Sequence, residues 1–229
     1  MSYDLVNYIP RYLTAITEWL ACVLFLFYIP HKRFPRGIAF LLHILALGML
    51  IGVNRLNELA PLALWFPAML LCMAVMLGFL MLCGRCSIWE GLYCWANAFL
   101  LAELGASLGW QLFYYASCAV QLGEAWEAVA AVITLSTALV VDAAVALLIH
   151  HQRKIYATFI TPRHALRSLA IALAAFGMSN SNYAFNTSVV SVATGAGVLY
   201  VRTLFDLIGM IAMITQDLQL HESQLTHEL

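Results

Sequence analysis

Long apolar runs constrain this chain more than any other feature of its sequence. Reading along it for runs broken by charge, Pro or Gly gives seven candidates. A membrane-crossing helix needs about 20 mostly apolar residues. Because 63% of the residues are hydrophobic and only 10% are charged, a soluble fold, typically about 25% charged, fits poorly. We therefore predict an all-α, polytopic membrane helix bundle with about seven transmembrane helices. The runs cover residues 12–28, 37–53, 61–83, 88–114, 128–149, 166–179 and 195–215.

The predicted organisation is one membrane domain, residues 1–215, followed by a cytoplasmic helical tail, residues 216–229. The sixth run is the weakest, because the polar segment 179–182 (Ser-Asn-Ser-Asn) interrupts it. In the tail, Leu218, Leu225 and Leu229 share one face of a helix. That face can start a signalling coiled coil and pair two copies as a homodimer, or the tail can be a solvated helix.

The positions of Lys and Arg predict the orientation, because basic loops stay on the cytoplasmic side. Met1–Arg11 lacks the basic start and cleavage site of a signal peptide, so the first run is expected to remain. We predict an outside amino terminus and a cytoplasmic carboxyl terminus in the cell membrane. Most of the 11 basic residues lie between the first and second, third and fourth, or fifth and sixth runs: Lys32, Arg33, Arg36, Arg85, Arg153, Lys154, Arg163 and Arg167.

Ionisable residues inside the runs are the candidate functional residues, because a charge at mid-membrane costs about 2.5–3.5 kcal/mol or more. Arg202 and Asp206 are four positions apart on one helix face, so they can neutralise each other. Ser107 shares a face with Glu103 and Gln111. The primary candidates are Glu18, Glu103, Gln111, Arg202 and Asp206. Additional candidates are Asn97, Ser107, Asp142 and Asn180.

Depth along the runs places Glu18, Glu103 and Arg202 in the outer half of the membrane, where with Gln111 they can line a polar cavity open to the outside. Such a cavity would take an extracellular or membrane-borne small ligand or peptide. The alternative is an interhelical salt bridge that only fixes the packing. Asp142 lies in the inner half, where a protonated structural Asp is favoured over a proton relay.

No catalytic motif, nucleotide-binding loop or metal-ligand pattern is visible, so no catalytic residue, metal or cofactor is predicted. Cys83 and Cys86 form a C-x-x-C pair, which fits free cysteines better than a zinc site because the short turn offers no supporting framework. A net charge of -1 gives no basic field for nucleic acid, so lipid is the expected surrounding and nucleic acid is not an expected partner.

Several segments together resemble the membrane sensor region of Gram-positive GHKL-type sensor histidine kinases. They are IPRYLTAITEWLACVLF at 9–25, AFLLAELGASLGWQLFY at 98–114, the polar run at 179–182, and VLYVRTLFDLIG at 198–209. The resemblance implies a signal-sensing module with a cytoplasmic carboxyl terminus. In those kinases an ATP-binding domain follows, whereas this chain stops at Leu229, so we expect no enzymatic activity from the chain itself.

The predicted function is therefore membrane signal sensing by a module like the input half of a sensor histidine kinase. Two other classes stay open. A small ion-coupled transporter would use Glu103, Asp142 and Asp206 to mark a path, although no inverted repeat is evident. A passive membrane subunit would pair with its partner through residues 216–229.

Overall fold

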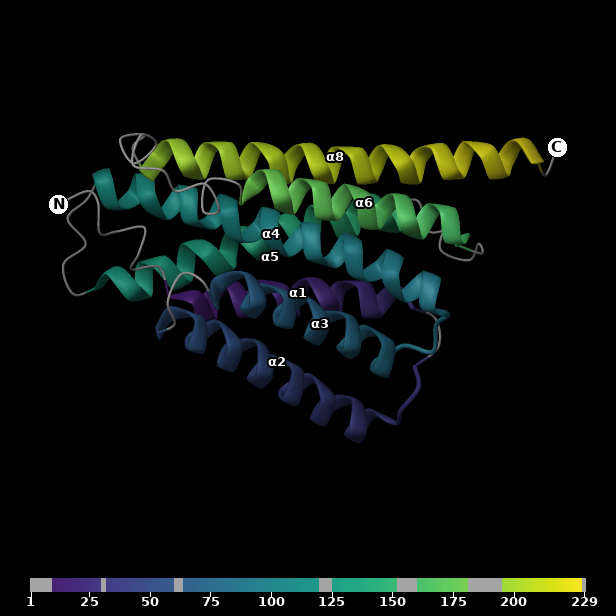
Figure 1. The fold of residues 1–229 in the computed structure, drawn as a ribbon, viewed down its shortest axis with the longest axis horizontal. Helices are drawn as coiled ribbons and strands as arrows, with labels where there is room; N and C mark the ends of the chain where they lie inside the picture. Colours follow the sequence, from purple (N-terminus) through teal and green to yellow (C-terminus); the bar gives the residue numbers. More distant parts are fainter. Residues whose placement is uncertain are drawn as a thin grey trace.

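The computed structural model describes residues 10–29, 32–59, 64–119, 125–151, 160–180 and 195–227. In these residues the chain forms helices joined by turns, so the all-α prediction is confirmed (Figure 1). The helices are α1 (Arg11–Tyr28), α2 (Arg36–Leu59), α3 (Trp65–Cys83), α4 (Ile88–Ala119), α5 (Trp126–His151), α6 (Pro162–Ser179) and α8 (Gly195–His227). Each apolar run of the sequence lies on one of them.

Three of the helices are long and apolar enough to cross a membrane: α2, α3 and α5. Within the spanning windows, only 17% of the residues of α2 and 17% of those of α5 are buried inside the protein. Phe40 and Leu41 on α2 and Val140 and Leu147 on α5 are each more than half exposed. A bilayer can cover such a surface, whereas water would leave it as a large apolar patch.

The remaining helices carry ionisable side chains within their apolar sequences. Glu18 lies on α1, Glu103 on α4, and Arg202 and Asp206 on α8, whereas α6 has Arg167 in its second turn. Helix α6 is also short, at 18 residues, with Pro162 at its first position. The buried charged residues Glu18, Glu103, Arg202 and Asp206 therefore lie on helices that are not among the three apolar spans, whereas Asp142 lies on α5.

Helix α4 occupies the centre of the bundle and packs against α1, α3, α5, α6 and α8. Small residues allow its closest contacts. A Cβ atom added at Gly109 would lie 2.9 Å from the Cα of Thr134 on α5. A Cβ added at Gly209 of α8 would lie 2.7 Å from the Cβ of Ala175 on α6. The first approach brings α5 against α4 and the second brings α8 against α6. Helices α8 and α6 lie on one side of α4, while α2 lies at the far edge against α1 and α3 (Figure 1).

One end of the bundle gathers the basic turns and the exit of α8. The turn after α1 pairs with the turn after α3 through a bridge between Lys32 and Gly84, and the amide of Arg33 donates to the carbonyl of Cys83 at 3.0 Å. The last turns of α8 extend beyond the other helices at this same end (Figure 1). Arg153 and Lys154 lie outside the described residues.

Candidate functional site

A buried ion pair joins α4 to α8. Nη2 of Arg202 donates to Oε2 of Glu103 at 2.7 Å, and the two side chains are 6% and 1% exposed. The guanidinium also lies over the ring of Trp110, 5.0 Å from its centroid. Taking two charges out of water is costly unless their geometry is good, so the short distance and the aromatic cover are what allow the pair to be buried.

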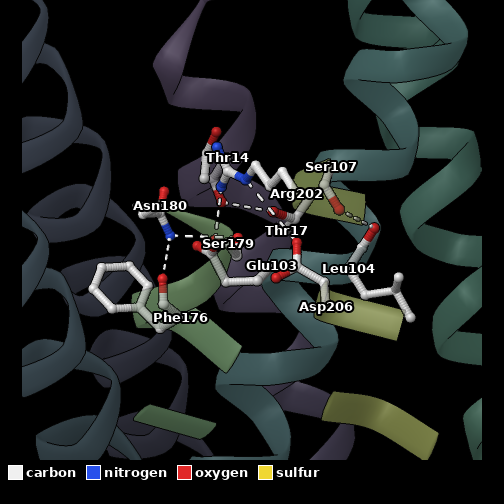
Figure 2. A network of polar contacts seen from close by, with 10 residues as sticks. All are labelled: Thr14, Thr17, Glu103, Leu104, Ser107, Phe176, Ser179, Asn180, Arg202 and Asp206. Carbon is white, nitrogen blue, oxygen red and sulfur yellow. Dashed lines mark hydrogen bonds and ion pairs between the residues drawn. The ribbon is translucent and has the colours of Figure 1, made fainter. Parts of the chain in front are cut away.

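Asp206 lies one turn along α8 from Arg202 and adds a second carboxylate. Its Oδ2 is 4.0 Å from Nε of Arg202, so the pair four positions apart forms as a longer contact than the one with Glu103. The Ser107 hydroxyl of α4 and the Ser179 hydroxyl of α6 are its polar neighbours (Figure 2). Asp206 is 0% exposed. The polar network therefore includes side chains from α4, α6 and α8.

Helix α1 brings a third carboxylate, Glu18, which is 1% exposed. The Asn54 amide on α2 donates to its Oε2 at 3.3 Å, and also to the carbonyl of Leu50 at 3.1 Å. Glu18 interacts electrostatically with both Glu103 and Arg202. Two buried threonines of α1, Thr14 and Thr17, complete this side of the network (Figure 2). We refer to Glu18, Glu103, Arg202 and Asp206 as the acidic cluster.

The acidic cluster is closed to solvent, which corrects the expected polar cavity open to the outside. Arg202 is 5% exposed and the three carboxylates are 0–1% exposed. The physical reason is that the ring of Trp110 covers the guanidinium at the position where the sequence suggested Gln111. Gln111, the next residue, is partly exposed.

The additional candidates lie at different places. Ser107 belongs to the network, whereas Asn97 donates to the carbonyl of Tyr93 on its own helix at 3.0 Å. Asn180 donates to the carbonyl of Phe176 at 3.0 Å and lies beside Ser179. Asp142 on α5 is partly buried and interacts electrostatically with Cys22 of α1, which lies one turn from Glu18.

A second polar contact set fixes α8 where it leaves the bundle. Gln216 donates to the Ser168 hydroxyl at 3.0 Å and to the carbonyl of His164 at 3.1 Å, both on α6. The Tyr93 hydroxyl of α4 donates to Asp217. Burial raises the pKa of Asp217 to about 6, while the Tyr93 bond lowers it in part. The first two residues of the predicted tail, Gln216 and Asp217, are therefore bonded to α6 and α4.

Sequence reasoning missed Asn54, Trp110 and the contacts of Gln216 and Asp217. Asn54 lies just beyond the second predicted run, and a polar residue at that depth was the available signal. The described residues contain no group of three or more His, Cys, Asp or Glu side chains that could hold a metal ion. What the acidic cluster can do chemically is store charge, exchange protons and fix the relative positions of three helices, α1, α4 and α8.

No family model, no curated protein and no solved structure matches the chain.

Proposed function

We propose that this chain is a membrane signal-sensing module, with its amino terminus outside and its carboxyl terminus in the cytosol, in which α8 reports the state of the acidic cluster. The observation that carries the proposal is the position of Arg202. This residue makes the buried ion pair with Glu103 and lies on the same uninterrupted helix as the exit residues Gln216 and Asp217. A change at the ion pair can therefore reach the cytosolic end through one rigid element.

Two further features support the proposal. The apolar faces of α2 and α5 suit a lipid surrounding. The basic turns at Lys32, Arg33 and Arg85 lie at the end from which α8 emerges, as expected for a cytosolic face. On this proposal all seven helices cross the bilayer. Glu18, Glu103, Arg202 and Asp206 lie on three of these helices and are turned toward the bundle interior.

The proposed mechanism is a shift between two arrangements of α8. In one, Arg202 bonds Glu103 and covers Trp110, as observed. In the other, an extracellular or membrane-borne small molecule or peptide loosens this pair, and Arg202 turns toward Asp206. A ligand that favours the second arrangement by about 1.4 kcal/mol changes the population ratio about tenfold. The proposed output is a displaced tail, which in a homodimer changes the pairing of the two tails.

A chimera tests this function without knowledge of the ligand. A histidine-kinase catalytic domain is joined after Leu229, and autophosphorylation is measured in membranes for the unchanged sensor and for Glu103→Gln. Loss of the carboxylate charge weakens the pair with Arg202, so we expect basal output to change about tenfold in either direction. The matched control is Glu90→Gln. Glu90 lies at the beginning of α4, outside the cluster, and its carboxylate accepts a hydrogen bond from the backbone amide of Ser87.

The control chimera is expected to match the unchanged one. If Glu103→Gln inserts normally and both variants give the same output as the unchanged chimera, then α8 does not report the state of the cluster. In that case the sensing function is rejected.

A small ion-coupled carrier is the second candidate, and one observation favours it. Cys22 of α1 interacts electrostatically with both Glu18 of α1 and Asp142 of α5, so two acidic groups from neighbouring helices lie near the same thiol. Uptake into proteoliposomes that disappears in Asp142→Asn, with chimera output unaffected by Glu103→Gln, would favour the carrier over the sensor.

A further inference from the structure

The acidic cluster holds more negative than positive charge. Three carboxylates, Glu18, Glu103 and Asp206, are 0–1% exposed, and the cluster contains one guanidinium, that of Arg202, which contacts Glu103 and Asp206. An uncompensated ion in a low-dielectric interior is far costlier than in water, and such a group takes up a proton or binds a cation instead. The cluster therefore needs at least one further positive charge.

The contacts identify the carboxylate that is least compensated. One oxygen of Glu103 and both oxygens of Asp206 are also buried without a hydrogen-bond partner in the described residues, but each of these two carboxylates contacts the Arg202 guanidinium, Glu103 at 2.7 Å and Asp206 at 4.0 Å. Glu18 receives only the Asn54 amide at 3.3 Å, and the amide also serves Leu50 and Cys72. The other oxygen of Glu18, Oε1, is buried and has no hydrogen-bond donor in the described part of the chain.

We propose that Glu18 is a proton-binding site, and that the closed bundle holds it as a neutral carboxylic acid. A proton suits the site because each buried carboxylate oxygen lies under packed side chains and the described residues offer no metal-binding group. The bound proton sits on a Glu18 oxygen, which becomes a hydrogen-bond donor toward the neighbouring acceptors. Release of the proton makes Glu18 negative, so the cluster then has a net charge of two negative units. The new charge on Glu18 attracts Arg202 and draws it away from Glu103.

The groups that surround Glu18 set this equilibrium. They come from every helix packed against α1 and from α8, which lies beyond α4: His43 of α2, next to Trp19 on α1; Cys72 of α3; Glu103 of α4; Asp142 of α5, through Cys22; and Arg202 of α8. Arg202 favours the charged form of Glu18, whereas Glu103 and burial favour the neutral form. Proton binding is a property of the cluster alone; only its consequence for α8 rests on the proposed function.

Infrared spectroscopy of the full chain in lipid nanodiscs tests the proposal. A neutral carboxylic acid gives a carbonyl stretch that a carboxylate lacks, and isotope labelling of the Glu carboxyl carbon separates Glu from Asp signals. We expect a labelled-Glu acid band at neutral pH that is absent in Glu18→Gln and retained in Glu90→Gln. Glu18→Gln should insert and fold normally, because an amide copies the shape and charge of the neutral acid.

Three results overturn the proposal: no acid band in the unchanged protein at neutral pH, a band that survives in Glu18→Gln, or a Glu18→Gln chain that does not fold. Replacing potassium with sodium is expected to leave the band unchanged, and its loss would show a metal cation in place of the proton. The spectrum does not depend on kinase output. An acid band together with unchanged output of the Glu103→Gln chimera rejects the sensing function alone. No acid band together with a changed output of that chimera rejects the bound proton alone.

Discussion

At the scale of single residues, Arg202 links the acidic cluster, because two carboxylates and the Trp110 ring contact its guanidinium. Hydrogen bonds inside membrane bundles contribute about 0.6 kcal/mol on average. Breaking a buried ion pair costs much more, about 3–5 kcal/mol, because the remaining charge is left without compensation. Stability should therefore depend on keeping both partners or removing both.

Replacing Arg202 with Leu should lower the free energy of unfolding by about 3 kcal/mol at neutral pH. The double variant Arg202→Leu/Glu103→Leu should recover part of this loss, because no unpaired Glu103 remains. Arg55→Leu is the matched control: Arg55 is exposed and lies 4.6 Å from the Tyr12 ring centroid, so about 1 kcal/mol is expected. Denaturant unfolding in mixed micelles measures all three variants. Equal losses for Arg202→Leu and Arg55→Leu would contradict the burial argument.

Protonation of Asp217 should strengthen the attachment of α8 to α4. Because burial raises its pKa to about 6, the packed state binds the proton more tightly than a released helix does. The attachment is therefore strongest at pH values below the ordinary pKa of an Asp carboxyl group, and it weakens as pH rises through about 6. Amide hydrogen exchange beyond residue 215, corrected for intrinsic rates, should show protection falling over this range.

Two variants check the assignment of this pH dependence. Asp217→Asn should abolish it. Tyr93→Phe should move the transition to higher pH, because it removes the hydrogen bond that lowers the Asp217 pKa. An unchanged profile in Asp217→Asn would assign the titration to another group.

At the scale of helices, the sequence was sufficient for the existence and approximate bounds of the elements. The run 88–114 lies on α4 and the run 166–179 on α6, because apolar length and Pro or charge boundaries determine where a helix forms. The rotation of each helix about its axis was not predictable. Glu103 and Ser107 face the network as expected, but the next turn presents Trp110 in place of Gln111. That choice depends on the neighbouring helices, which no local pattern encodes.

Glycines of α4 determine how closely α5 approaches. Gly109→Ala should cost about 1–3 kcal/mol, because the new Cβ would meet the Thr134 backbone at 2.9 Å and that backbone cannot move independently of α5. Gly48→Ala on α2 is the control, since nothing lies within 4 Å of its Cβ position, and it should be neutral or stabilising by up to about 1 kcal/mol. Thermal unfolding in detergent compares the pair. Equal effects of the two changes would show that α4 and α5 are not in close contact.

At the scale of the whole molecule, two cysteines mark opposite ends of the bundle. Cys118 is exposed near the end of α4, and Cys86 is partly exposed in the turn between α3 and α4, while Cys22, Cys72, Cys83 and Cys94 are buried. With the proposed orientation, a membrane-impermeant maleimide should label Cys118 on intact cells. It should reach Cys86 only after permeabilisation, and slowly, because burial raises the pKa of the Cys86 thiol.

The variant Cys118→Ser should remove the labelling of intact cells. Labelling of Cys86 before permeabilisation would contradict the proposed orientation and would show that the end of α8 lies outside.

The central claim is that the Glu103–Arg202 ion pair determines the position of the cytosolic end of α8. Spin labels at positions 163 on α6 and 219 on α8, both exposed, in a Cys86→Ser/Cys118→Ser background, report that position as a distance distribution. Glu103→Gln should shift or broaden the distribution, while Glu90→Gln leaves it unchanged. Superimposable distributions in a normally folded Glu103→Gln protein would contradict the claim.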